Sequence, residues 1–373
     1  MDALMLPLNW QRVRLGDIGK PCMCKRVMKH QTTRYGEIPF YKIGTFGNTA
    51  DAFISKKLFL EYKTKYSFPK KGDILISASG TIGRAVIYDG KPAYFQDSNI
   101  VWIDNDETLV KNDFLFYAYS NVKWNTEHTT ILRLYNDNFR NTLIPLPPLN
   151  EQSAIANILS GLDRYLCALD ALILKKEGVK KALSFELLSQ RKRLKGFNQA
   201  WQRVRLGDIA NYLTSNLSVE QITQQGEIKV YDVNNFIGYT DTTFISDKPY
   251  ISIVKDGSVG RVRILPPKTN ILSTMGALIA NHRTTTEFLF YLLSNFDFKN
   301  FTSGSIIPHI YFKDYKEKTI FLPPLNEQSA IANILGGLDN EIASLKNKKR
   351  QFENIKKALN HDLMSAKIRV LEK

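Results

Sequence analysis

LPPLNEQSAIANIL, at residues 146–159, occurs a second time without change at residues 322–335, 176 positions further along the chain. A shorter motif, WQRVRLGDI, is likewise found at residues 10–18 and again at residues 201–209. Both halves of the chain therefore run in one order: short motif, variable block, long motif. A repeat of this length indicates two copies of one structural unit. The two variable blocks between the motifs have diverged almost completely.

The long motif predicts the start of a long helix. Pro147 and Pro148 end the preceding element, and Asn150 is expected to cap the helix. Beyond it, apolar residues recur at steps of four and three. They are Ile155, Leu159, Leu162, Leu166, Leu169 and Ile173 in the first copy, and Ile331, Leu335, Leu338, Ile342, Leu345, Phe352, Leu359 and Leu363 in the second. This heptad pattern predicts two coiled-coil helices of roughly 40 residues, the first ending near Leu194.

Each variable block has the pattern of a small mixed domain. Short apolar runs flank pairs of glycines, at residues 72–77 and 84–88 in the first block and at residues 250–254 and 261–265 in the second. Such runs predict strands joined by a turn. Aromatic-rich runs at residues 114–117 and 288–291 predict helices packed against these strands. The sequence thus predicts an α+β fold with a pseudo-twofold internal repeat.

The repeat divides the chain into four predicted parts. These are a first mixed domain (residues 1–145), a first long helix (146–200), a second mixed domain (201–321) and a second long helix (322–373).

The composition points to a basic, ordinary globular protein. Lys and Arg number 51 against 36 acidic residues, a net charge of +15. This excess suits a polyanionic partner such as nucleic acid, although charge can also serve solubility alone. The three cysteines fit neither a disulfide framework nor a zinc site. The chain also lacks a long apolar run and a basic signal sequence at its start, so we expect a cytoplasmic protein without a metal or other cofactor.

Three features together resemble the specificity (S) subunits of type I restriction–modification systems, over essentially the whole chain. One is the proline-led helix start in both copies. Another is the pair of glycine turns, SGTIGR at residues 79–84 and DGSVGR at residues 256–261. The third is KRLKGF at residues 192–197, just ahead of the second WQRVRLGDI.

The resemblance implies a DNA-binding protein with two target-recognition domains that each read half of a split, asymmetric DNA site. It implies that the two helices pack antiparallel as a spacer and dock two methyltransferase (M) subunits. A restriction/translocase (R) subunit would join the complex for cleavage. Catalytic residues are expected in those partners and not in this chain.

Two other classes of function stay open at this point. One is a scaffold that oligomerises through its coiled coil and binds protein partners. The other is a self-sufficient nuclease, because Asp51 with Glu61 and Lys63 could hold a metal ion. That pattern is short, and the surrounding lysines favour a DNA-facing stretch. Phosphate-binding glycine loops of the nucleotide-binding type are missing from the sequence.

The candidate DNA-contacting residues are polar, basic or aromatic and lie on predicted loops. Arginine suits the acceptor edge of guanine, asparagine suits adenine, and lysine more often contacts phosphate. The first block offers Lys25, Arg26, Arg34, Ser79, Thr81, Arg84, Arg133 and Tyr135. The second block offers Asn234, Asn235, Ser258, Arg261, Arg263, His309 and Tyr311.

One aligned pair suggests how the two blocks differ. At the offset of 176, Arg133-Leu-Tyr135 falls on His309-Ile-Tyr311. A shared tyrosine beside an exchanged residue is what two readers of different bases would need. Drift at solvent-facing loop positions would give the same pattern.

Overall fold

The structure is a computed structural model that describes residues 7–128 and 132–370. The outer ends of the two terminal parts predicted from the sequence, residues 1–6 and 371–373, lie outside the described residues, as do residues 129–131. The chain divides into two compact units, residues 1–169 with 348–373, and residues 170–347. Each unit holds one mixed domain and a segment of each long helix.

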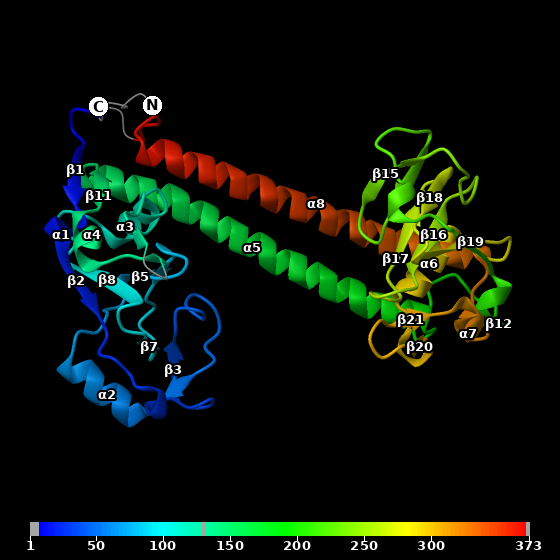
Figure 1. The fold of residues 1–373 in the computed structure, drawn as a ribbon, viewed down its shortest axis with the longest axis horizontal. Coiled ribbons are helices and arrows are strands. Elements are labelled where there is room, and N and C mark those ends of the chain that lie inside the picture. Colours follow the sequence, from blue (N-terminus) through cyan, green and yellow to red (C-terminus); the bar gives the residue numbers. More distant parts are fainter. Residues whose placement is uncertain (1–6, 129–131, 371–373) are drawn as a thin grey trace. The chain divides into compact units, whose positions relative to one another are not determined.

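The mixed domain of the first unit is built on two sheets (Figure 1). A four-stranded antiparallel sheet has the order β2-β8-β5-β6, and a smaller sheet, β4-β3-β7, contains a parallel pair. The first and last strands, β1 and β11, pair with each other. In chain order the elements are β1 (Gln11–Arg14), α1 (Leu15–Ile18), β2 (Gly19–Met23), β3 (Ile38–Tyr41), β4 (Phe53–Ile54), α2 (Lys56–Lys65), β5 (Ile74–Ser77), β6 (Ala85–Ile87), β7 (Tyr94–Phe95), β8 (Ile100–Asn105), α3 (Asn112–Tyr119), β9 (Glu127–His128), β10 (Leu132–Arg133), α4 (Asn136–Asn141) and β11 (Leu143–Leu146).

The mixed domain of the second unit repeats this plan. The sheets β13-β19-β16-β17 and β15-β14-β18 and the closing pair β12-β22 correspond strand for strand to those of the first domain. The elements are β12 (Gln202–Arg205), β13 (Ala210–Thr214), β14 (Ile228–Tyr231), β15 (Phe236–Thr240), β16 (Tyr250–Val254), β17 (Val262–Leu265), β18 (Thr269–Ile271), β19 (Met275–Ala280), α6 (Thr286–Ser294), β20 (Thr302–Ser303), β21 (His309–Ile310), α7 (Phe312–Tyr315) and β22 (Thr319–Leu322). Helix α2 has no counterpart, because residues 241–249 form no helix. The predicted α+β repeat, its strands and its aromatic helices are confirmed.

The two long helices are α5 (Leu149–Leu188) and α8 (Leu325–Met364), of 40 residues each, as predicted. Two details of the prediction were wrong. Helix α5 already begins at Leu149, so Asn150 lies inside the first turn and does not cap it. The helix also ends at Leu188, six residues before Leu194, and Gln190 then takes a left-handed conformation with φ +60°. That conformation turns the chain out of the helix.

The heptad positions bury the helices against each other within each unit. In the first unit the start of α5 lies beside the end of α8 (Figure 1), and Asp163 pairs with Lys356. In the second unit Lys180 Nζ lies 2.5 Å from Asp339 Oδ1. In both units residue numbers rise along one helix as they fall along the other, so the packing is antiparallel. Ile155, Leu159, Ile331 and Leu335 are at most 1% exposed.

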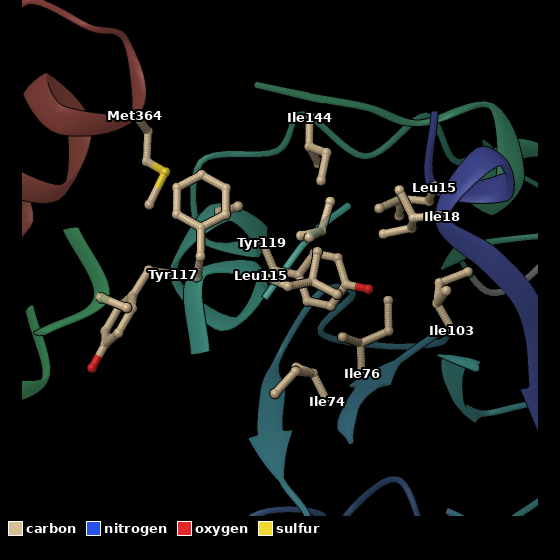
Figure 2. Packing of buried hydrophobic residues seen from close by; sticks show 14 of the residues in the cluster. Leu15, Ile18, Ile74, Ile76, Ile103, Leu115, Tyr117, Tyr119, Ile144 and Met364 are labelled. Atoms are coloured by element: carbon tan, nitrogen blue, oxygen red, sulfur yellow. The ribbon is translucent and has the colours of Figure 1, made fainter. Parts of the chain in front are cut away.

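Helix α3 supplies the centre of the first unit's core (Figure 2). Its Phe114, Leu115 and Tyr119 are at most 1% exposed, and they pack with strand residues and with Met364 from the end of α8. Tyr119 lies among aliphatic side chains such as Ile103 (Figure 2). Its hydroxyl has no hydrogen-bond partner among the described residues. Burial raises the pKa of this phenol.

Replacing Tyr119 with phenylalanine is expected to stabilise the protein. A buried hydroxyl without a partner costs about 1–3 kcal/mol, so Tyr119→Phe should raise the free energy of unfolding by about 1 kcal/mol in urea denaturation. The matched control is Tyr117→Phe, which removes a hydroxyl that donates to Asp163 Oδ2 at 2.7 Å and should lower stability. Equal effects of the two changes would contradict this reading of Tyr119.

Candidate nucleic-acid interface

The repeated glutamine of the long motif fastens each mixed domain to its helix. The buried Gln152 amide donates to the carbonyl oxygens of Leu109 and Pro147, at 2.9 and 2.8 Å, and its own oxygen accepts from the Lys111 amide. Gln328 makes the matching bonds in the second unit, to Arg283 O, Pro323 O and the Thr285 amide. The motif thus recurs unchanged partly because both domains need the same junction.

A buried glutamate beside each glutamine adds a second junction. Trp10 Nε1 donates to Glu151 at 3.0 Å, and Arg369 donates to both oxygens of the same carboxylate. In the second unit Trp201 and Arg193 bind Glu327 in the same way. The bond to Glu327 raises the pKa of Arg193 above its usual value. These contacts explain why the short motif begins with tryptophan, and why the segment that follows each long helix packs on a domain.

A third junction joins the aromatic helix of each domain to both long helices. Tyr117 donates to Asp163, which also pairs with Lys356. In the second unit Tyr291 donates to Asp339 at 2.8 Å, and Asp339 pairs with Lys180. Burial, and then the bond to the carboxylate, raise the pKa of both tyrosines. Each mixed domain is therefore rigidly seated on the helical segments of its own unit.

The glycine turns join an inner strand to the edge strand of each main sheet, β5 to β6 in the first domain and β16 to β17 in the second. Gly83 and Gly260 have φ near +80°, and a Cβ there would come within 2.1 Å of Trp124 Nε1 or 2.6 Å of Phe298 Cδ2. Only glycine allows this approach without displacing the aromatic ring. In both domains the turn thus packs against an aromatic ring, Trp124 or Phe298. The residues at the tip of the turn, Thr81 and Ser258, are exposed.

The arginine that ends each turn reaches across to a neighbouring loop. Arg84 donates to the carbonyl of Phe46 at 2.9 Å. Arg261 donates to Asn234 Oδ1 at 2.9 Å, and Arg263 donates to the Asn234 carbonyl at 2.7 Å while stacking over Tyr231. In both domains the loop reached follows the central strand of the smaller sheet. The structure thus brings Arg84 and Arg261 to equivalent places, where they brace a loop.

The exchanged pair lies directly beside the turns. Ser79 forms an isolated β-bridge with Arg133, and Asp256 forms the equivalent bridge with His309. Arg133 is exposed, and it lies opposite Glu127 in the β9–β10 pair. His309 instead places Nδ1 2.6 Å from Asp256 Oδ1. The tyrosines two residues further on, Tyr135 and Tyr311, are 41% and 49% exposed.

The remaining candidates are spread over the surfaces of the two domains. Lys25 lies over the Tyr66 ring at 5.1 Å, and Arg26 approaches Asp97 at 3.9 Å. Arg34 is exposed, and no described contact ties it to the turn. In the second domain the amides of Asn234 and Asn235 both donate to Asp232, which shapes an exposed loop. These residues stay predicted DNA contacts.

Two residues that matter here were missed in the sequence. Asp256 holds His309, and Asn99 Oδ1 accepts from the Ser79 hydroxyl at 2.7 Å. Asp256 could have been found, because it replaces Ser79 in the aligned glycine turns while His309 replaces Arg133. Asn99 carries no such signal, because it comes close to Ser79 only through folding.

The residues considered for a nuclease site make other contacts. Asp51 pairs with Lys42 at 2.8 Å, Glu61 pairs with Lys65 at 3.1 Å, and Lys63 lies over the rings of Phe59 and Phe68. Within residues 7–128 and 132–370 we find no group of three or more histidine, cysteine or acidic residues that could hold a metal ion. The same residues include no helix long and apolar enough to span a membrane.

Comparison with known proteins decides the family. Residues 7–176 and again residues 198–354 match the family described as type I restriction modification DNA specificity domain. The chain belongs to this family. It is a DNA specificity subunit with two recognition domains, and the two matches include the two mixed domains of the fold.

Individual relatives agree with this assignment. The specificity subunit is 25% identical, over 99% of its length and 95% of the relative, to the type I restriction enzyme MjaVIII specificity subunit of Methanocaldococcus jannaschii. It is 64% identical over 39% of its length to a putative type I specificity subunit of Haemophilus influenzae, of which the match covers 38%. Its fold resembles the crystal structure of an S subunit from M. genitalium, with a TM-score of 0.63 at 20% identity over 96% of this chain and 98% of that one.

Proposed function

We propose that this specificity subunit reads a two-part, asymmetric DNA site, with one recognition domain for each half. The observation that carries the proposal is that the two domains share their supporting residues but differ in the side chain beside the glycine turn. The glycine turns, the bracing arginines Arg84 and Arg261 and the tyrosines Tyr135 and Tyr311 occupy equivalent places in both domains. The side chains between them differ, with Arg133 in one domain and His309 in the other. Two equivalent domains with different exposed side chains suit two different half-sites.

The proposed contact surface of each domain is the glycine turn with its neighbouring loops. Its members are the predicted residues Lys25, Arg26, Arg34, Ser79, Thr81, Arg84, Arg133 and Tyr135 in the first domain, and Asn234, Asn235, Ser258, Arg261, Arg263, His309 and Tyr311 in the second. Ser79 is 5% exposed and Arg84 braces a loop, so these two would act by positioning. A net charge of +15 supports phosphate contacts around the base readers.

We further propose that the helix starts dock M subunits, one on each unit. Leu149 and Ile158 are exposed on α5, and their repeats Leu325 and Ile334 are exposed on α8, at 38–47% in all four cases. Packing explains why the buried residues of the long motif are the same in both copies. It does not explain why the exposed residues are the same too. The same exposed surface presented twice fits one kind of partner bound twice.

In the proposed complex the other subunits would supply the catalytic chemistry. The M subunits would methylate the DNA, and R subunits would join for cleavage. We expect this assembly in the cytoplasm, where its DNA substrate is found. A coiled-coil scaffold for protein partners and a self-sufficient nuclease are the competing functions, and the contacts made by Asp51, Glu61 and Lys63 do not favour the second.

Calorimetry and duplex binding test the division of labour. The purified chain is expected to bind no S-adenosylmethionine and to cut no DNA with or without Mg²⁺, whereas adding M subunits should give sequence-dependent duplex binding that weakens steeply with salt. A heat of cofactor binding from the pure chain would contradict the non-catalytic assignment. Metal-dependent cutting by the pure chain would favour the nuclease, and duplex binding without sequence preference in the full complex would favour the scaffold.

A further inference from the structure

The ring of His309 is held in one orientation. Its Nδ1 lies 2.6 Å from Asp256 Oδ1, and its plane lies within 22° of the Tyr311 ring at a centroid distance of 6.5 Å. Gly304, at φ +91°, folds the preceding loop so closely that a Cβ there would lie 3.0 Å from His309 Cδ2. Rotation of the imidazole would break the bond to Asp256. The ring is therefore preorganised before any ligand arrives.

The bond to Asp256 also sets which ring nitrogen carries the proton. A carboxylate can only accept, so Nδ1 must donate to it. In the neutral ring the other nitrogen, Nε2, is then a hydrogen-bond acceptor. No described residue bonds Nε2, and 35% of the His309 side chain is exposed. The second recognition domain thus presents a fixed acceptor beside its glycine turn.

We infer that His309, with Asp256 as its positioning residue, accepts a hydrogen bond from an exocyclic amine of a DNA base. The inference rests on the proposed reading of one half-site by each domain. The amines exposed in the major groove are N6 of adenine and N4 of cytosine. A phosphate oxygen cannot serve this acceptor, because it offers no proton.

The first domain has the opposite hydrogen-bond polarity at the equivalent place. Arg133 carries only donors, which suit the O6 and N7 acceptors of guanine. Its bridge partner Ser79 is not an acid, and the Ser79 hydroxyl donates to Asn99. One frame therefore carries an acceptor in one domain and a donor in the other. Asp256 is the residue that makes the difference, because it fixes His309 as an acceptor.

The tautomer can be measured without DNA. In the full chain labelled with ¹⁵N-histidine, long-range ¹H–¹⁵N spectra at pH 7.5 should show a protonated Nδ1 and an unprotonated Nε2 for His309, assigned by the signals lost in His309→Asn. A protonated Nε2 would overturn the inference. This result does not depend on whether the two domains read half-sites.

The reading role is tested by exchanging the two pairs in the complete complex with M subunits. Asp256→Ser combined with His309→Arg installs the first domain's pair in the second domain. The first half of the methylated motif should be unchanged. At one position of the second half, the base read through its amine, adenine or cytosine, should be replaced by guanine. The variant complex should bind the duplex with the changed half-site about tenfold more tightly than the wild type does, and the original duplex about tenfold more weakly, as for a single base mismatch. The reciprocal control, Ser79→Asp with Arg133→His, should change the first half alone.

The outcomes separate this inference from the proposed function. A second half-site unchanged by the exchange would overturn the role of His309. Asp256→Asn offers a milder variant, because an amide can donate to Nδ1 and favour the wrong tautomer. It should reduce discrimination at the same base pair by about tenfold while the first half-site is kept, and full discrimination would contradict us. A wild-type complex without any two-part motif would instead overturn the proposed function.

Discussion

A chain in which residues 202–321 are replaced by a second copy of residues 11–145 is expected to direct methylation to an inverted repeat of the first half-site. The change should be complete, because each domain is fastened to its helix start by equivalent contacts. Gln152 and Gln328, and likewise Trp10 and Trp201, make matching bonds in the two units. The transplanted domain should therefore seat on the second helix start as it does on the first. Mapping of methylated sites in cells that express the complex measures the result.

The reciprocal chimera is the matched control for this exchange. Placing residues 202–321 in the position of residues 11–145 should give an inverted repeat of the second half-site. Assembly with M subunits should be unchanged in both chimeras, because the helices are retained. A methylation motif that keeps its original second half in the first chimera would contradict the assignment of one domain to one half-site.

Aspartate at the repeated exposed isoleucine is expected to remove bound M subunits one at a time. Ile158→Asp and Ile334→Asp should each leave one of two M subunits, and the double variant should leave none. Both side chains are about 40% exposed, so folding tolerates the charge. An unpaired carboxylate buried in an apolar interface weakens binding by about 2 kcal/mol or more. Native mass spectrometry of the purified complexes counts the subunits.

Leu174→Asp provides the matched control for docking. Leu174 is 68% exposed on the same helix, but the residue 176 positions later is Arg350, so it lies outside the repeated surface. This variant should keep two M subunits and a normal melting temperature. Two M subunits bound to the Ile158→Asp, Ile334→Asp double variant would show that docking lies elsewhere on the protein.

The fold was largely predictable because its strongest signals are periodic and occur twice. The heptad residues Ile155 and Ile331 are buried in the cores of the two units, and the apolar runs at residues 74–77 and 250–254 are strands. The errors were local. Asn150 looks like a helix cap, but the chain already turns helical at Leu149, where Pro148 O accepts from the Gln152 amide. Propensity alone cannot place a helix boundary that side-chain contacts decide.

The candidate site was predictable only in part, because the sequence shows which side chains are present but not which residues they contact in the fold. Arg84 and Arg261 are the same letter in both turns, and both brace a loop. Arg133 and His309 differ, and they lie beside the glycine turns. The arginines that are identical in the two halves thus hold the loops in place, whereas the exchanged residues are the ones that can contact different bases. The bond from His309 to Asp256 spans 53 positions of sequence, and the paired exchange with Arg133 and Ser79 is its one signal in the sequence.

The most direct test of the central claim is the methylation motif of the wild-type complex. Expression of the chain with its M subunits in a host without other DNA methyltransferases, followed by genome-wide mapping of methylated bases, reads this motif in one measurement. We predict two specified half-sites of different sequence, separated by unspecified base pairs. A palindromic motif, a single continuous motif, or methylation without sequence preference would contradict the account of two different readers on one repeated frame.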